Sequence, residues 1–306
     1  MSQAITQNIE YPCSYDGTLQ PARALRSSKV KQPLLVILHP WSHGYEVLNM
    51  PKVEQWCLDN DWNLIHPHFR GPSWNVLSCG HDAAVQDIVD AVRFGISEYK
   101  ADSKNVFLTG ISGGGFHTML MTGRHPELFR GTSSWVGISD IKAWHLESTK
   151  RRYGYDGHIE KVCGGNPQVD EKASAEALRR SAISYLKVGN PIESIEISAG
   201  IHDGHTGSVP ISQSIHAYNA LVGEEARVSQ ELIGIMTETA TIPPEAAFAD
   251  EDPTFGSKKI LFRRKSGNVR LNIFEGGHDL GIVIVGGSVY RGDTVVGLQG
   301  RYIFGY

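Results

Sequence analysis

The sequence has few cysteines, no excess of positive charge and no long apolar run. None of the four cysteines forms a C-x-x-C pair or lies at zinc-ligand spacing from a histidine, so no metal site is expected. The formal net charge of -4 gives no basic surface for nucleic acid. No segment approaches the roughly 18 apolar residues of a membrane-spanning helix. These absences argue against a metalloprotein, a nucleic-acid partner and a membrane partner.

The first residues also lack the charged region and the apolar region of a secretory signal. This absence favours a cytoplasmic location. A secreted protein trimmed of its signal would begin in the same way, so secretion stays open. A chain of 306 residues with 41% hydrophobic content can bury one large core, as a single catalytic domain does.

The most informative segment is NVFLTGISGGGFHT, residues 105–118. An apolar run leads into a G-x-S-x-G motif at residues 110–114, and a sequence able to begin a helix follows. In a nucleophile elbow the serine occupies a strained turn between a strand and a helix, and glycine tolerates the crowding on either side. Ser112 is therefore the candidate nucleophile.

An acid and a histidine follow in the order that this motif requires. Asp203 lies in a glycine-rich loop after the strand-like residues 194–199, and His278 follows the strand-like residues 269–274. An imidazole that takes the serine proton needs a carboxylate to fix its tautomer, which predicts a Ser112, His278 and Asp203 triad. Asp140 is the alternative acid. Three further histidines are interpreted as loop or packing residues: His117, His202 and His205.

The same mechanism needs two backbone N–H groups to bind the oxyanion. Gly113, directly after the candidate nucleophile, supplies the first. The apolar run at residues 33–38 reads as a buried parallel strand and ends in HPWSHG, residues 39–44. Pro40 has no N–H to donate, so Trp41 is the expected second donor, with Ser42 as the alternative.

These segments together resemble the α/β-hydrolases, and within them the prolyl oligopeptidase-like and dienelactone-hydrolase-like esterases and peptidases. The resemblance extends from about residue 33 to 279, and it implies an α/β-hydrolase fold with a Ser-His-Asp triad and no cofactor. The segments that carry it are LLVILHPW, HPHFRGPSW, DAAVQDIVDAV, GISGGG, ISAGIHDGHTGSVP and FEGGHD.

Alternating strand and helix patterns predict an α/β fold, a mostly parallel sheet with helices on both faces. Residues 1–279 form the expected catalytic domain, which begins with a hairpin in residues 7–30. Residues 141–193 are expected to form a small lid or pocket wall, or else a solvated helical layer. Residues 223–258 read as a polar surface excursion.

Residues 280–306 are expected to be a β-rich extension. The segment VYRGDTVVGLQGRYIFGY within it resembles a repeat of the sugar-dehydrogenase-type β-propellers, although one repeat cannot close a propeller. No quinone cofactor is inferred from it. The other interpretation is an ordinary hairpin packed against the edge of the hydrolase sheet.

The favoured activity is hydrolysis of carboxylic esters, with a small-molecule substrate that carries a short acyl group, including sugar-acetyl or aryl esters. Aromatic candidates for the pocket are Trp41, Trp74, Trp144 and Tyr153, whose flat rings suit sugars or aryl groups. A serine peptidase is the nearest alternative, although residues 1–30 are too short for the propeller that oligopeptidases of this kind carry. An inactive binding module with the same fold is the third interpretation. The sequence leaves the oligomeric state open.

Overall fold

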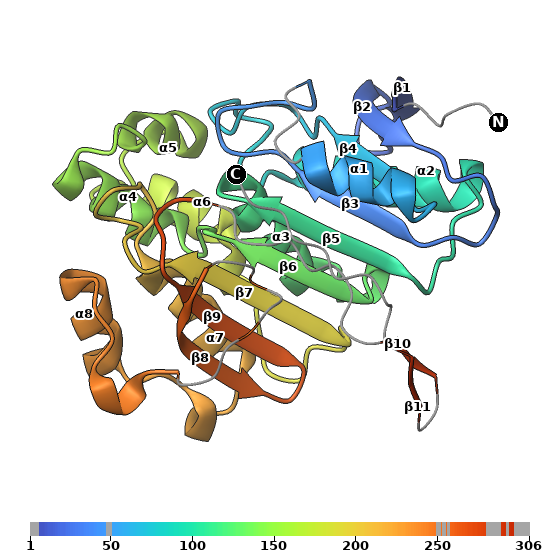
Figure 1. Ribbon diagram of the computed structural model, residues 1–306. Helices are drawn as coiled ribbons and strands as arrows, with labels where there is room; N and C mark the ends of the chain where they lie inside the picture. The colour runs from blue at the N-terminus through green and yellow to red at the C-terminus, as the bar shows by residue number, and fades with distance from the viewer. Residues whose placement is uncertain are drawn as a thin grey trace.

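The computed structural model describes residues 6–46, 51–248, 252, 255 and 258–279, together with the backbone of residues 289–291 and 294–296. A nine-stranded sheet in the order β1-β2-β4-β3-β5-β6-β7-β9-β8 runs through the molecule (Figure 1). Its six central strands are parallel, and the strands at both edges are antiparallel. The strands are β1 (Gln7–Pro12), β2 (Leu19–Leu25), β3 (Leu34–Leu38), β4 (Asn63–Pro67), β5 (Val106–Ile111), β6 (Gly131–Trp135), β7 (Ser194–Gly200), β8 (Ile260–Ser266) and β9 (Val269–Phe274).

Helices cover both faces of this sheet, which confirms the α/β prediction (Figure 1). β3 illustrates why, since all five of its residues are buried and alternate side chains belong to two different cores. Leu34 and Val36 pack in the large core with α2, α3 and α7, whereas Leu35 and Ile37 pack with α1. The helices are α1 (Pro51–Asp59), α2 (Asp82–Glu98), α3 (Gly113–Arg124), α4 (Ile141–Arg151), α5 (Asp156–Cys163), α6 (Glu171–Arg180), α7 (Ile211–Leu221) and α8 (Gln230–Thr239), with short 3₁₀ turns at Pro126–Leu128, Ala182–Ser184, Glu224–Ala226 and Pro244–Ala246.

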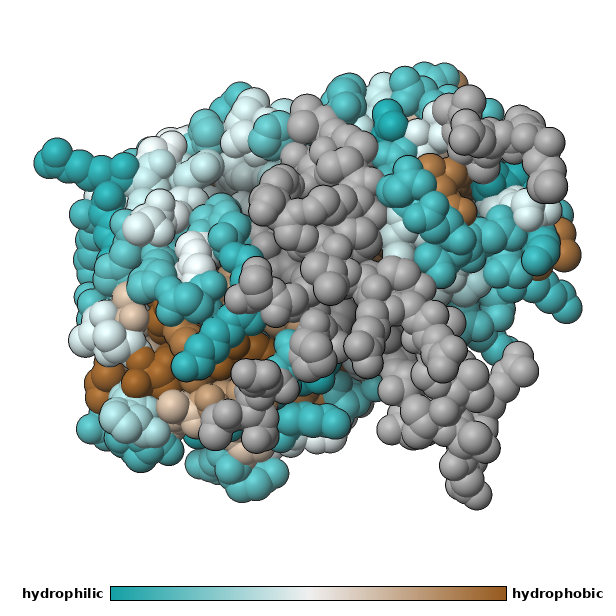
Figure 2. All heavy atoms as spheres, viewed as in Figure 1, coloured by the Kyte–Doolittle hydropathy of each residue, from teal (hydrophilic) through white to brown (hydrophobic). Residues whose placement is uncertain are grey.

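The segment after β6 consists of three helices, α4, α5 and α6, rather than a loop. Their inward side chains include Trp144, Ile159 and Ala173, all in the large core. On the face seen in Figure 2, polar and weakly polar side chains dominate the upper left, where these helices lie. The segment is thus a helical layer with a buried inner side and a polar outer side.

Part of the polar segment 223–258 differs from the expected surface excursion. Residues 230–239 form α8, whose first turn is capped by Ser229, the hydroxyl of which accepts a hydrogen bond from Leu232 N (3.2 Å). Ile233 and Met236 bury one side of this helix in the large core. The apolar pair is spaced by three residues, which is a helical spacing that the polar composition of the segment obscured.

The C-terminal residues include a two-stranded antiparallel hairpin of β10 (Val289–Arg291) and β11 (Thr294–Val296). The rest of the expected β-rich extension lies outside the described residues. In the part of the chain that the structure describes, no helix is long and apolar enough to cross a membrane.

Candidate active site

Ser112 lies between β5 and α3 with φ 56° and ψ -117°, a backbone conformation that non-glycine residues rarely adopt. Its N–H donates to Trp135 O (2.9 Å) on the neighbouring strand, and its carbonyl begins the helix by accepting from Phe116 N (2.8 Å). A side chain at Gly114 would collide with the carbonyl group of Leu38 at the end of β3. The close approach of these backbones therefore explains the glycines of the motif.

The structure brings Ser112, His278 and Asp203 together from three separate parts of the chain. His278 Nε2 lies 2.9 Å from Ser112 Oγ, and His278 Nδ1 lies 2.7 Å from Asp203 Oδ2. The carboxylate at Nδ1 favours the tautomer with its proton on that nitrogen, which leaves Nε2 free to accept from the serine hydroxyl. The Asp203 side chain is fully buried, whereas that of His278 is 24% exposed.

Backbone N–H groups of the loop after β7 fix the position of the Asp203 carboxylate. Its second oxygen, Oδ1, accepts hydrogen bonds from Gly204 N and Val209 N, both at 3.0 Å. A side chain at Gly207 would collide with this carboxylate and with His278 Cβ. With both oxygens engaged, the carboxylate has a fixed orientation toward the imidazole.

The alternative acid and two of the other histidines have hydrogen-bond partners outside the triad. Asp140 caps the start of α4 by accepting from Ala143 N (2.9 Å), which is a structural use of a carboxylate. His202 Nε2 pairs with Glu275 Oε1 (2.7 Å) on the surface, and His205 Nε2 lies 2.8 Å from Thr237 O.

His117 is fully buried beneath the elbow. Its Nδ1 donates to Gly113 O (2.8 Å), and its Nε2 accepts from Gly80 N (3.1 Å). Burial lowers the pKa of this imidazole to about 3, so the ring is neutral and holds the backbone of Gly113 in place.

The two expected oxyanion donors are neighbours in space. A Cβ atom at Gly113 would lie only 2.5 Å from Trp41 N, so the backbones after β5 and β3 are in direct contact there. The carbonyl of Pro40 belongs to the same peptide group as the Trp41 N–H, and it accepts from His43 N (3.2 Å), which helps to orient that peptide. Two N–H groups beside a serine are the arrangement that binds a developing oxyanion.

The structure corrects part of the prediction for aromatic pocket residues. Trp144 is only 1% exposed and Trp41 only 2%, because their rings pack edge to face with centroids 4.9 Å apart. The Trp144 indole N–H also donates to Ser208 O (2.8 Å). Neither ring offers a flat surface to a ligand, since each is used to join the helical layer to the sheet.

The other two aromatic candidates are half-buried. Trp74 packs against His158 of α5, with ring centroids 5.0 Å apart. The hydroxyl of Tyr153 donates to Gly204 O (2.5 Å), so this residue contacts the loop that carries the acid. Arg151 Nη1 donates to the same carbonyl (3.2 Å), a contact that nothing in the sequence indicated.

Among the described residues, no group of three or more His, Cys, Asp or Glu side chains could hold a metal ion. All four cysteines, Cys13, Cys57, Cys79 and Cys163, are buried free thiols. Burial raises the pKa of the Cys163 thiol to about 11, which makes it a weak nucleophile at neutral pH.

The chain matches one family model and, over shorter stretches, several curated esterases. Residues 76–237, more than half of the chain, match the model of the prolyl oligopeptidase family. A probable acetylxylan esterase A of Aspergillus niger is 46% identical over 83 residues, which are 25% of this chain and 27% of that protein. Feruloyl esterase B of Thermothelomyces thermophilus is 25% identical over 115 residues, 35% of this chain and 40% of that protein. The matched region thus spans about a quarter to two fifths of these relatives.

Solved structures share the fold. The acylaminoacyl peptidase of Pyrococcus horikoshii superposes with a TM-score of 0.58 at 16% identity, over 91% of this chain and 38% of that one. Prolyl oligopeptidase B of Galerina marginata gives the same TM-score and identity over 78% of this chain and 35% of that one. These likenesses confirm the predicted α/β-hydrolase fold. None of these similarities supports a propeller repeat at the C-terminus.

Proposed function

The chain belongs to the prolyl oligopeptidase family, and we propose that it is a serine hydrolase that cleaves carboxylic esters with Ser112, His278 and Asp203. The observation that carries this proposal is the continuous hydrogen-bonded series from Ser112 Oγ through the imidazole to the buried Asp203 carboxylate. Residues 1–279 are the proposed catalytic domain, and residues 141–193 form a wall of it.

In the first half of the reaction, Ser112 Oγ attacks the ester carbonyl carbon while His278 Nε2 takes the hydroxyl proton. The negative charge moves to the carbonyl oxygen, where the N–H groups of Gly113 and Trp41 stabilise it. Asp203 stabilises the imidazolium. The intermediate then collapses, the bond to the alcohol oxygen breaks, and His278 returns its proton to the leaving alcohol.

The second half repeats these steps with water. His278 takes a proton from a water molecule, whose oxygen attacks the acyl-serine carbonyl carbon. The same two N–H groups stabilise the second tetrahedral intermediate. Its collapse releases the carboxylic acid, and Ser112 Oγ regains its proton from the imidazolium, so the enzyme is restored.

Short acyl groups on a sugar or aryl alcohol are the proposed substrate class. The names of the curated relatives, acetylxylan esterase and feruloyl esterase, support ester cleavage in a carbohydrate setting. Trp74 supports it too, because a half-buried indole beside His158 can pack against a sugar or aryl ring. The second candidate is a peptidase, which the fold shared with acylaminoacyl peptidase favours.

A comparison of substrates tests the proposal. We expect kcat/KM for p-nitrophenyl acetate and butyrate to exceed that for longer acyl chains and for alanyl and prolyl nitroanilides. Faster turnover of the nitroanilides would replace the esterase assignment with the peptidase. Failure of the native chain to hydrolyse any ester or amide, together with no labelling by a fluorophosphonate, would favour an inactive binding module.

A further inference from the structure

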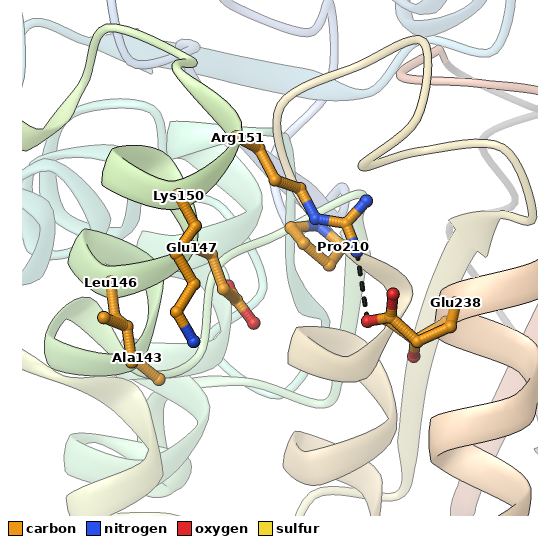
Figure 3. A pocket seen from close by; sticks show the side chains of 8 residues that line it. Ala143, Leu146, Glu147, Lys150, Arg151, Pro210 and Glu238 are labelled. Atoms are coloured by element: carbon orange, nitrogen blue, oxygen red, sulfur yellow. Dashed lines mark hydrogen bonds and ion pairs between the residues drawn. The ribbon is translucent and has the colours of Figure 1, made fainter.

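A cavity of about 610 Å³ lies between α4 and α8 (Figure 3). Its position follows from the topology, since α4 comes after β6 and the loop that ends at Pro210 comes after β7. Both elements therefore leave the sheet at the carboxyl ends of parallel strands, the edge at which ligands bind in open α/β sheets. The volume is within the range of about 300 to 1,000 Å³ for small-molecule sites. The walls are formed by Ala143, Leu146, Glu147, Lys150, Arg151, Pro210, Thr237 and Glu238.

Hydrogen-bond donors and acceptors face each other across this cavity. Arg151 of α4 and Glu238 of α8 extend toward one another and form an ion pair (3.1 Å) that spans the gap (Figure 3). Lys150 also lies on the α4 side and makes no ion pair or hydrogen bond with any described residue. Its ammonium group is therefore available to a ligand.

Glu147 adds a group that can both accept and donate. Its carboxyl oxygens accept hydrogen bonds from Gln213 Nε2 (2.9 Å) and Ser212 Oγ (3.4 Å). Desolvation by burial raises the pKa of this carboxyl to about 7, so near neutral pH a proton is present on much of the population. In that form the group donates a hydrogen bond.

The cavity shares a wall with the loop that holds the catalytic acid. Arg151 Nη1 and the Tyr153 hydroxyl both donate to Gly204 O, and Gly204 directly follows Asp203. A side chain at Gly204 would also collide with Pro210, which lines the cavity. The cavity therefore borders the loop that carries Asp203.

We propose that this cavity is a carbohydrate subsite, which holds a neutral sugar ring in the alcohol part of the ester. The inference rests on the proposed function. Each sugar hydroxyl both donates and accepts, which suits walls where Lys150 and Arg151 donate and Glu238 accepts. Leu146 and Pro210 supply apolar surface for the C–H groups of the ring. Two basic and two acidic side chains line the walls, so their charges largely offset one another, which suits a neutral ring.

Calorimetry on the native chain tests binding without any reaction. The probe is xylobiose, which has no ester bond. We expect measurable binding, and an affinity about five- to tenfold weaker in Lys150→Met and in Glu238→Gln, since each removes a charged hydrogen-bond partner. Lys172→Met on α6 is the matched control, because Lys172 is exposed and does not line the cavity, and it should bind as the native chain does.

Three calorimetric results would overturn the subsite. These are no binding of xylobiose by the native chain, equal affinity in the native chain and both cavity variants, and binding of glucuronate in preference to xylobiose. The last result would identify an anion site instead of a neutral sugar site.

Kinetics distinguish a failed subsite from a failed enzyme. With acetylated xylobiose, Lys150→Met should raise KM about five- to tenfold and leave kcat unchanged, because it removes binding and no step of the chemistry. Turnover of p-nitrophenyl acetate, which has no sugar, should match the native value. An equal loss on both esters would overturn the subsite, since the cavity would then only brace the triad. If the native chain cleaves neither ester, the proposed function fails, and the calorimetry still decides the subsite.

Discussion

The serine side of the site and the α4–α8 side are built in different ways. Around Ser112, backbone packs directly on backbone, with glycines at the contacts and a neutral buried His117 beneath them. Between α4 and α8, the walls are long charged side chains, and part of the space is open. Rigid backbone contacts suit the positioning of reacting atoms, whereas flexible charged side chains suit binding of a polar group. Substitutions on the two sides should therefore differ in kind as well as in size.

The largest effect should come from the serine itself. Ser112→Ala removes the nucleophile and leaves the packed backbone unchanged, so we expect ester turnover to fall by on the order of 10⁴ to 10⁶ with unfolding midpoint and circular dichroism preserved. Labelling by a fluorophosphonate should disappear as well. Retention of more than a few per cent of the native rate by the folded variant would reject Ser112 as nucleophile.

The second-largest effect should be the loss of kcat on substitution of one candidate acid, Asp203, compared with the other, Asp140. Asp203→Asn removes the carboxylate that orients His278, so we expect kcat to fall roughly 10⁴-fold. Asp140→Asn should have little effect on kcat, because this residue caps α4 and an asparagine also caps well. Steady-state kinetics of both purified variants check this, and the opposite order would make Asp140 the catalytic acid.

Two glycine substitutions compare how tightly the serine side and the α4–α8 side are packed, through their effect on the free energy of unfolding. Gly114→Ala places a methyl group against the end of β3, and we expect the free energy of unfolding to fall by about 1–3 kcal/mol or more. Gly234→Ala in the exposed middle of α8 meets no atom within 4 Å, so helix propensity should stabilise the chain by up to about 1 kcal/mol. Urea unfolding measures both. Equal effects would contradict the difference in packing.

The last comparison concerns the pH dependence of stability. Burial raises the pKa of Glu147 from an ordinary 4.5 to about 7, so the folded chain holds this proton more tightly than the unfolded chain does. The resulting stability is fully present below pH 4.5 and is lost as pH rises through 7. Glu147→Gln should remove roughly 2 kcal/mol of this dependence.

Urea unfolding at pH 5 and pH 8 measures that dependence. The native chain should lose more stability than Glu147→Gln between the two values. Identical losses of stability in the native chain and in Glu147→Gln would show that burial does not raise the pKa of Glu147.

Local sequence predicted much of the serine side because its determinants are close together in the chain. The motif at residues 110–114 specifies its own strained turn, and α3 begins at Gly113, within the segment that the sequence indicates can begin a helix. The order of Ser112, Asp203 and His278 also follows from the sequence, since each comes at the end of a strand. Their strand ends meet because parallel strands place their carboxyl ends at one edge.

Other features depended on contacts between distant residues. Composition gave no sign that Trp144 would be buried, because its ring is removed from solvent by packing against Trp41, more than a hundred residues away, and against Tyr155. The polar residues on either side of 230–239 likewise obscured α8, which is stabilised by burial of Ile233 and Met236 in a core formed elsewhere.

The sequence by itself determined the chemistry of the candidate site: which residue is the nucleophile candidate, which loops carry the acid and the base, and which strand end supplies the oxyanion donor. Those are local properties, fixed by strand ends and by turns that need glycine. Only the tertiary structure decided the distances between them, the burial of the Asp203 carboxylate and the cavity beside its loop. The physical reason is that hydrogen bonds, desolvation and cavity walls arise between residues that folding brings together from distant parts of the chain.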